Sequence, residues 1–450
     1  MEVTGLPADA VVVGAGPAGA ATALRLARAG ARVVLLDRAH FPRDKACAEY
    51  LSTKSVRQLH AMDAVQPVRD AGAVPVHGMR VRSPGGYVMT GHLATSREAG
   101  ATPAGLDVGL ALRRTLLDAV LVQLARDAGV RVIEGARVDG VLHDPAGRVT
   151  GVRYAAPSGV HRELRALLVV GADGLRSVVA RRLNLVRGAG VPRRMAFVAH
   201  FEGVRGLDDF GEMHVEPDGF VGIARTGDGQ SNAALVVPAA LARSAAGDAA
   251  GFLEAWIRAR PHLAPRFAHA RRVGTGRGRV LATGPFSHST QRPWAAGAAL
   301  VGDAAEYFDP FTGEGIWSAL RGAELLAPRA LASMDAAAHG RFGEADASLQ
   351  RYAADRRSAF AGKWVVERLI ATFVAHPRLM DHAVGALARH QDMADVLVGI
   401  TGNATPARTL LSPHFLARLL AGPHLPRMGA HEPRTLTAAS PQRPTTMNGR

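Results

Sequence analysis

The sequence predicts an α/β protein in which a Rossmann-like dinucleotide-binding domain is joined to a mostly antiparallel sheet and a helical C-terminal part. Three observations predict this fold class. Residues 9–38 follow a strand–turn–helix–strand pattern, residues 195–238 alternate apolar and polar side chains between glycine turns, and helical spacing prevails from Ile316 onward.

The first unit is a dinucleotide fingerprint. An apolar strand at residues 10–13 precedes three glycines in G-x-G-x-x-G spacing, and the helix that follows ends near Gly30. Such glycines permit a tight turn, a close approach of backbone to a pyrophosphate and close packing of helix on strand. The helix N-terminus attracts phosphate, and the acid at the tip of the second strand can accept hydrogen bonds from a ribose. The predicted cofactor-binding residues of this unit are Gly14, Gly16, Pro17, Gly19, Asp37 and Arg38.

The composition is that of an ordinary globular protein. Of the 450 residues 48% are hydrophobic and 21% are charged, which suits two or three domains. No apolar run is long enough to span a membrane, and no signal pattern precedes the fingerprint, so we expect a cytoplasmic protein. Because Cys47 is the only cysteine, we predict neither an intrachain disulfide nor a metal site.

The formal net charge of +15 comes almost entirely from arginine. The arginines are scattered, without a long basic run or interleaved aromatic residues, so we do not expect nucleic acid as a partner. Arginine suits the phosphates of a dinucleotide, and most of the others are expected to form a solvated surface.

The remaining segments extend the pattern in chain order. Residues 76–93 predict a hairpin around Pro84-Gly85-Gly86, and residues 110–128 predict an amphipathic helix. Apolar strands at 167–170 and 298–301 run into the segments GADGLRS (171–177) and GDAAEYFDPFTGEGI (302–316). The C-terminal helices break at His376-Pro377, and the tail from His431 is predicted to be disordered.

These segments predict a discontinuous dinucleotide-binding domain with insertions. Its three parts are residues 1–75, 101–187 and 271–330; a substrate domain comprises a hairpin at 76–100 and residues 188–270; C-terminal helices cover 331–430, and the tail covers 431–450.

The fingerprint, GADGLRS and GDAAEYFDPFTGEGI together resemble the family of FAD-dependent aromatic hydroxylases, flavin halogenases and geranylgeranyl reductases over roughly residues 8–330. The resemblance implies that the dinucleotide is FAD and that Asp303 contacts its ribityl or ribose portion. It also implies that Arg114 and Asp173 serve the cofactor, although an isolated Asp of this kind is more often a turn or helix-cap residue. The further cofactor residues that it implies are Gly302, Pro310, Gly313, Gly315 and Ile316.

The glycine turn before Ile316 also has a physical rationale. Reduced flavin carries negative charge, and a helix N-terminus supplies unpaired N–H donors and a partial positive charge. Gly313 and Gly315 would let backbone approach a flat ring closely.

Two branches of the family compete for the assignment. Residues 42–47 and 313–316 resemble the geranylgeranyl reductase branch, but Ala48-Glu49-Tyr50 follows Cys47 where that branch usually has Gly-Asp or Gly-Glu and then Gly. Its aromatic clamp Tyr-x-Trp-x-Phe-Pro is absent, with residues 220–224 in its place, and the halogenase signature is absent too. We therefore predict a monooxygenase that hydroxylates an aromatic or polyketide-like molecule. The alternatives are reduction of a C=C bond in an isoprenoid or related apolar substrate, and a flavin-binding protein without turnover.

Cys47 is the candidate catalytic residue. It lies near the expected flavin edge, and Arg43 and Lys45 would lower its pKa, although a lone cysteine is more often a small buried hydrophobe. His200 and His214 fall on predicted strands of the substrate domain, where each is either a base or, more often, a packed histidine.

The expected partners follow from the same reading. No second nucleotide fingerprint occurs, so NADPH or NADH would bind transiently across the FAD domain as the reductant. The substrate is expected to be an apolar or aromatic small molecule. We also expect peripheral membrane contact through helices between Trp364 and Ala388, and a monomer or homodimer.

Overall fold

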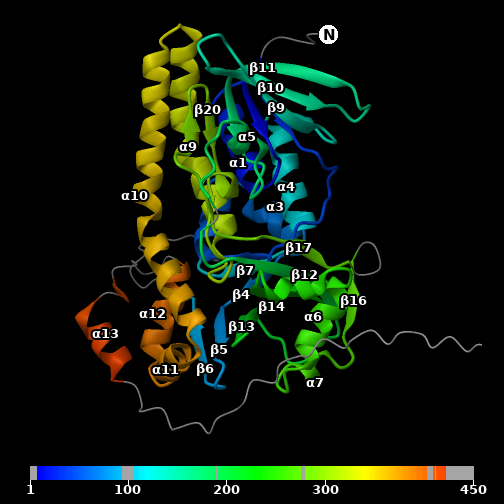
Figure 1. Cartoon of the computed structure of the whole chain (residues 1–450), viewed down its shortest axis with the longest axis vertical. Helices are drawn as coiled ribbons and strands as arrows, with labels where there is room; N and C mark the ends of the chain where they lie inside the picture. Colours follow the sequence, from blue (N-terminus) through cyan, green and yellow to red (C-terminus); the bar gives the residue numbers. More distant parts are fainter. Residues whose placement is uncertain are drawn as a thin grey trace, which may run out of the picture.

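The computed structural model describes residues 8–93, 106–188, 190–274, 279–402, 409–410 and 412–421. The tail that the sequence predicts to be disordered lies outside these residues. In Figure 1 a parallel sheet with long helices occupies the upper half of the molecule, and a second sheet with shorter helices lies below it.

The first sheet is the predicted Rossmann-like unit. Its strand order is β19-β20-β11-β1-β2-β8. The four successive strand pairings from β20 through β11, β1 and β2 to β8 are all parallel. The strands are β1 (Ala8–Val13), β2 (Val33–Leu36), β8 (Arg131–Ile133), β11 (His161–Gly171), β19 (Trp294–Ala295) and β20 (Ala298–Leu300). Strands β9 (Arg137–His143) and β10 (Val149–Ala155) extend β11 as an antiparallel hairpin.

Helices α1 (Pro17–Arg28), α4 (Arg114–Asp127) and α9 (Gly315–Ala338) cover one face of this sheet. Leu24, Leu121 and Leu320 from the three helices meet in one buried cluster, which also includes Val12 of β1. Burial of these apolar faces fixes the helices against the sheet, and with them the glycine turns at their N-termini.

The second sheet is mostly antiparallel, as the alternating pattern predicts. Its order is β16-β12-β15-β14-β13-β5-β6, with β17 also on β12 and with β13 and β5 parallel. The strands are β5 (Gly78–Arg82), β6 (Val88–His92), β12 (Arg194–Glu202), β13 (Phe210–Glu216), β14 (Gly219–Gly227), β15 (Gln230–Pro238), β16 (Arg271–Val273) and β17 (Leu281–Thr283). The predicted hairpin at 76–93 is β5–β6. Strands β16 and β17 belong to this sheet, although their residues fall in the range assigned from sequence to the third FAD-binding part.

Side chains of the second sheet alternate between two apolar clusters. Phe197, Phe201 and Leu235 pack on one side with α6 (Ala249–Arg258), beyond which lies the short α7 (Ala264–Phe267). Val198 and Val236 belong to the cluster on the other side, which includes residues of the C-terminal helices. One wall of the second sheet is therefore apolar and faces away from α6.

Short elements join the two halves. Strands β3 (Tyr50–Leu51), β4 (Val74–Val76) and β7 (Gly109–Ala111) form a small sheet, β18 (His288–Ser289) pairs with β21 (Glu306–Tyr307), and α2 (Thr53–His60), α3 (Val65–Asp70) and α5 (Val178–Arg182) lie between strands. The predicted helix at 110–128 begins only at Arg114, because Leu110 and Ala111 pair with Leu51 and Tyr50. The apolar spacing of the helix continues backward into the short strand β7, so the sequence pattern predicted the start of the helix too early.

The C-terminal part is helical, with α10 (Phe342–Ala375), α11 (Pro377–Leu387), α12 (Gln391–Gly402) and α13 (Pro413–Leu420). The predicted break at His376-Pro377 is confirmed, because Pro377 starts a new helix. Among the described helices, none combines the length and apolar character needed to cross a membrane.

Candidate active site

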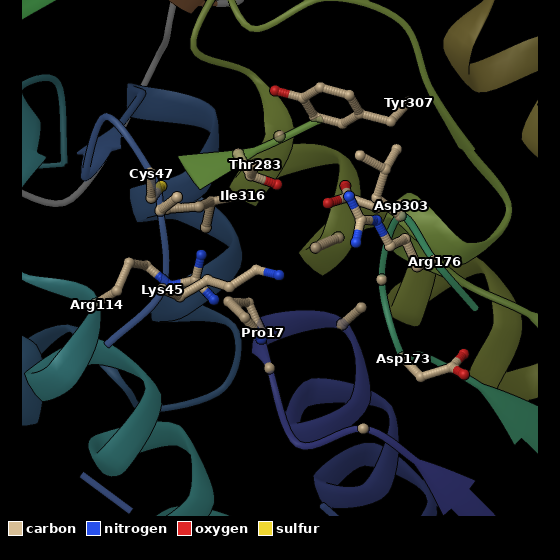
Figure 2. A pocket seen from close by; sticks show the side chains of 18 of the residues that line it. Pro17, Lys45, Cys47, Arg114, Asp173, Arg176, Thr283, Asp303, Tyr307 and Ile316 are labelled. Carbon is tan, nitrogen blue, oxygen red and sulfur yellow. The ribbon is translucent and has the colours of Figure 1, made fainter. Parts of the chain in front are cut away.

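A cavity of about 580 Å³ lies where the glycine turns of the first sheet face the apolar wall of the second. Figure 2 shows side chains from segments far apart in sequence around it, among them Cys47, Arg114, Asp173 and Asp303. The predicted site residues that line it are Gly14, Gly16, Pro17, Asp37, Arg38, Cys47, Arg114, Asp173, Asp303, Pro310, Gly313, Gly315 and Ile316.

Two predicted residues, Gly19 and Gly302, lie outside the lining and serve packing. A Cβ on Gly19 would lie 1.8 Å from the carbonyl oxygen of Gly14, so this glycine lets α1 pack against the turn. Gly302 has φ +62°, and a Cβ there would lie 2.8 Å from that of Ala18. The glycine turns of the first sheet that line the cavity form what we call the cradle. Gly19 and Gly302 support this cradle from the side away from the cavity.

The turn at the start of α1 fits a diphosphate. Gly14 has φ +98°, and a Cβ there would lie 2.5 Å from the Ala172 carbonyl oxygen, so the turn requires glycine. Gly16 is the N-cap of α1 and offers no capping side chain, while Pro17 lacks an N–H. The first-turn amides of this helix are thus left for an external anion.

Asp37 holds the glycine loop as well as lining the cavity. Its Oδ2 accepts a hydrogen bond from the Ala15 amide at 2.7 Å, and its Oδ1 accepts one from the Ala39 amide at 2.8 Å. Each carboxylate oxygen has a second lone pair, so the group can also accept from a ribose hydroxyl. Arg38 next to it is exposed at the rim of the cavity.

Positive charge gathers beside Gly16. Arg114 donates from Nε and Nη2 to the two oxygens of Asp118, both at 2.8 Å, and Arg43 Nη1 lies 3.0 Å from Asp118 Oδ2. Lys45 also lines the cavity; burial lowers its pKa, and Asp303 acts in the opposite direction. Arg43 Nη2 also lies 3.9 Å from Asp37 Oδ2, so Asp37, Asp118 and Asp303 partly balance the three cations, which remain within reach of a diphosphate at Gly16.

Asp173 caps a helix, which was the alternative considered for it. Its Oδ2 accepts a hydrogen bond from the Val178 amide at 2.6 Å, at the start of α5. Burial raises the pKa of this carboxyl group. Its Oδ1 is buried without a hydrogen-bond partner among the described residues.

The 302–316 segment forms the opposite side. Burial raises the pKa of Asp303, while Lys45 and Arg114 oppose this shift. Gly313 has φ +67°, and a Cβ there would lie 3.0 Å from the Tyr50 ring, so its backbone lies against that side chain. Helix α9 starts at Gly315 without a side-chain cap, and its first turn lines the cavity. These features fit the edge of a flat, anion-forming ring.

Cys47 lines the cavity, but the prediction of a lowered pKa is wrong. Burial raises the pKa of the thiol, and the favourable charge of Arg114 offsets this only in part. Arg43 instead pairs with Asp118. The Cys47 Sγ accepts a hydrogen bond from the Glu49 amide at 3.3 Å. The group is therefore a neutral thiol rather than a thiolate.

A buried polar network around Glu49 is a feature that the sequence reasoning missed. Glu49 has φ +60°, and its carboxylate accepts hydrogen bonds from the Arg114 amide at 2.9 Å, His200 Nε2 at 2.7 Å and Asn232 Nδ2 at 3.0 Å. Asn232 also donates to the Cys47 carbonyl at 2.9 Å. His200 and Asn232 are opposite each other on β12 and β15. The network ties the Cys47 loop to the second sheet, and His200 is a packed histidine.

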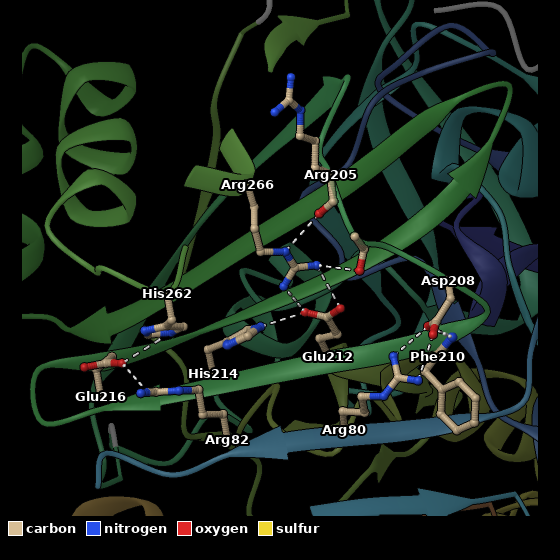
Figure 3. Close-up of polar contacts among 11 residues, drawn as sticks. Arg80, Arg82, Arg205, Asp208, Phe210, Glu212, His214, Glu216, His262 and Arg266 are labelled. Carbon is tan, nitrogen blue, oxygen red and sulfur yellow. Dashed lines mark hydrogen bonds and ion pairs between the residues drawn. The ribbon is translucent and has the colours of Figure 1, made fainter. Parts of the chain in front are cut away.

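The second sheet supplies the apolar half of the cavity through Ala196, Val198, Phe220 and Val236. His214 does not line it, because the side chain lies on the opposite face and bonds to Glu212 at 2.8 Å (Figure 3). Phe286 and Tyr307 complete the apolar wall near Gly315. Sequence periodicity predicted these strands but not which of their faces would meet the cradle.

A phosphate-binding cradle on a parallel sheet, joined to an apolar chamber, defines a dinucleotide-dependent oxidoreductase. Residues 7–366 match the model of the family described as FAD binding domain, and the chain belongs to this family. It is an FAD-dependent oxidoreductase.

Two relatives that match most of the chain are named as reductases. Digeranylgeranylglycerophospholipid reductase 2 of Methanopyrus kandleri is 31% identical over 404 residues, which cover 88% of this chain and 93% of that protein. Menaquinone reductase of Mycobacterium tuberculosis is 31% identical over 344 residues, which cover 73% and 78%.

Solved structures share the fold. The myxobacterial chondrochloren halogenase CndH has a TM-score of 0.72 at 24% identity, covering 82% of this chain and 83% of that one. PqsL, a probable FAD-dependent monooxygenase from Pseudomonas aeruginosa, has a TM-score of 0.65 at 22% identity, covering 83% and 98%. At these identities the likeness concerns the fold alone.

Proposed function

We propose that this protein reduces C=C bonds in an isoprenoid chain or a related apolar substrate, with NADPH or NADH as the reductant. One structural observation carries the proposal: the cofactor cradle opens directly onto an apolar wall formed by Ala196, Val198, Phe220 and Val236. An unfunctionalised hydrocarbon offers no hydrogen bonds, so apolar burial is what can hold it. The reductase names of the two relatives support the same branch.

The bound FAD would supply a two-electron carrier that takes a hydride from the nicotinamide and passes it on. The chain's residues would hold it in three places: the α1 N-terminus and Gly16 at the diphosphate, Asp37 at the adenosine side, and the turn at 312–315 at the ring edge. The N-terminus of α9 would stabilise negative charge on the reduced ring. The wall of the second sheet would exclude water from the reacting carbon atoms.

Hydroxylation, the main prediction from sequence, is the second candidate. The observation that favours it is the sequence of β14, where Phe220-Val-Gly-Ile-Ala224 stands in place of the reductase clamp. Gly222 lines the cavity next to Met213, whose Sδ would lie 3.1 Å from a Cβ at this position.

The mass of the product separates the candidates. The purified holoenzyme is incubated with geranylgeraniol and either NADPH or NADH, with and without oxygen, and the products are analysed by mass spectrometry. We expect a gain of two hydrogens per turnover, with no requirement for oxygen. A gain of one oxygen, on this substrate or on an aromatic one, with no hydrogenated product would reject the reductase in favour of the monooxygenase.

We further propose that α13 contacts an anionic lipid surface, where substrates of this class dissolve. Leu416 and Leu420 lie one helical turn apart and are 38% and 75% exposed. Leu379 of the adjoining α11 is 47% exposed and follows the exposed Arg378. Apolar side chains next to basic ones, on a chain of net charge +15, suit an anionic membrane rather than a neutral partner.

A further inference from the structure

Tyr307 lies between the two cofactor-facing parts of the 302–316 segment, at a position to which no sequence motif assigns a role. It ends the short strand β21, which pairs with β18 through His288. Its side chain lines the cavity, and Figure 2 shows it above Thr283, on the side of the cavity that also carries Asp303.

The ring of Tyr307 is fixed by two contacts. It packs on Phe286, with 5.3 Å between ring centroids, and joins the apolar cluster of the second sheet. A Cβ on Gly315 would lie 3.4 Å from Tyr307 Cε2. Because Cε2 is bonded to the carbon that carries the hydroxyl, the phenolic end of the ring is at the turn expected to hold the flavin edge.

The hydroxyl is available and protonated. Within the described part of the chain no group is hydrogen-bonded to it, and the residue is partly accessible from the cavity. Burial raises the pKa of the phenol, and the nearby carboxylates Asp303 and Asp309 raise it further. A neutral O–H donor thus faces the space between the cofactor turn and the apolar wall.

We propose that Tyr307 is the proton donor to the substrate carbon in C=C reduction. The inference rests on the proposed function. The alkene π bond would break: FAD held in the cradle and reduced by NADPH or NADH would supply a hydride to one carbon, and Tyr307 would give its phenolic proton to the other. The O–H bond leaves its electron pair on the phenolate oxygen, which recovers a proton from solvent. Two hydrogens and two electrons are thereby added to the bond.

One competing acid is Cys47, because its thiol is neutral and lines the same cavity. Its sulfur already accepts a hydrogen bond from the Glu49 amide, and its loop is tied to the second sheet through Asn232. Tyr307 has no such partner and lies at the Gly315 turn. The two assignments predict opposite outcomes for single substitutions.

The test compares Tyr307→Phe, Cys47→Ala and the control Tyr87→Phe, whose tyrosine packs on Gly385 outside the cavity lining. FAD content and the affinity of the oxidised enzyme for the fully saturated alcohol of geranylgeraniol are measured first. We expect both to stay within about twofold of wild type in Tyr307→Phe, because the ring and its packing remain. This readout needs no turnover.

Each enzyme is then reduced with dithionite under anaerobic conditions and mixed with geranylgeraniol, and flavin reoxidation is followed. We expect Tyr307→Phe to be slower by at least about a hundredfold, the usual scale for loss of a general acid. We also expect it to have lost the wild-type solvent deuterium isotope effect, and Tyr87→Phe to be unchanged. A Tyr307→Phe rate within about threefold of wild type, or a large loss only in Cys47→Ala, overturns the proposal. If the wild-type product gains oxygen instead of hydrogen, the proposed function itself fails, which is a distinct result.

Discussion

Glu49 supports the Cys47 loop through its carboxylate and through its backbone, whose amide donates to Cys47 Sγ and whose carbonyl accepts from the Leu112 amide. A non-glycine residue at φ +60° is strained by about 1 kcal/mol or more, so the surrounding bonds must hold it there. His200, Asn232 and the Arg114 amide do so from the second sheet and from α4. The sequence identified Cys47 and His200 as residues of interest. It did not reveal the link between them, because hydrogen bonds across more than a hundred positions leave no local pattern.

We predict that Glu49→Ala lowers the free energy of unfolding by about 3 kcal/mol, because the buried His200 loses its acceptor and Asn232 Nδ2 keeps only the Cys47 carbonyl. Urea denaturation of the holoenzyme measures the change. The control is Asp209→Ala, whose partner Arg225 is 50% exposed and whose loss is expected to cost less than about 1 kcal/mol. Equal losses of unfolding free energy in the two variants would show that the Glu49 network contributes no more to stability than an exposed ion pair.

At the scale of elements, the strands and helices with clear periodicity were predictable. The fingerprint unit, the β5–β6 hairpin, the alternating strands β12–β15 and the break before Pro377 all follow from patterns within a single segment. Strand β7 was missed because a three-residue strand is defined by its partner β3 rather than by its own sequence. The apolar side of the cavity could not be predicted for a similar reason. Period-two alternation shows that a strand has two faces, but it does not show which neighbour each face contacts.

The outer face of β13 carries a polar cluster that yields a prediction about pH. His262 stacks on His214, with Arg82, Arg266 and Glu216 around the pair (Figure 3). Burial, with the nearby arginines, lowers the pKa of His262 from 6.5 to about 4. The unfolded chain therefore binds a proton at this residue between pH 6.5 and pH 4 while the folded chain does not, so stability falls as the pH falls through this window.

We predict that unfolding free energy drops by about 1 kcal/mol between pH 7 and pH 5 because of His262, in addition to any common acid effect, since solvent screening at this partly exposed side chain reduces the full effect of the shift. The variant His262→Gln cannot titrate, so its stability curve should be flatter by that amount over the same range. The exposed His161→Gln, whose side chain is 61% exposed, serves as the control. Parallel curves for wild type and His262→Gln would contradict the prediction.

At the scale of the whole molecule, the fold places a charged cradle and an apolar wall on either side of one cavity. The family resemblance anticipated the cradle, because its motifs are local and ordered in sequence. The reaction type depends on the chamber, whose shape comes from two sheets that meet only in the folded protein. The missing aromatic clamp pointed toward hydroxylation, whereas the relatives that share most of the chain's length are named as reductases.

The lipid contact proposed for α13 belongs to this scale as well. We predict that the wild-type protein cosediments with vesicles that contain phosphatidylglycerol and that Leu416→Glu with Leu420→Glu weakens binding by at least about tenfold, since two leucines leave the lipid and two like charges are added. Val160→Glu, at a position 56% exposed in the β10–β11 turn, is the matched control. If the double variant binds the vesicles as strongly as the wild type does, the proposal that α13 contacts lipid is wrong.

The cradle is built from three segments that are far apart in the chain: Val13 pairs with both Leu36 and Gly171, and Gly171 pairs with Leu300. A nascent chain therefore has no complete cofactor site until the start of α9 has left the ribosome, which takes at least about 15 s at 5–20 residues per second. Flavin loading is consequently a late event in biogenesis.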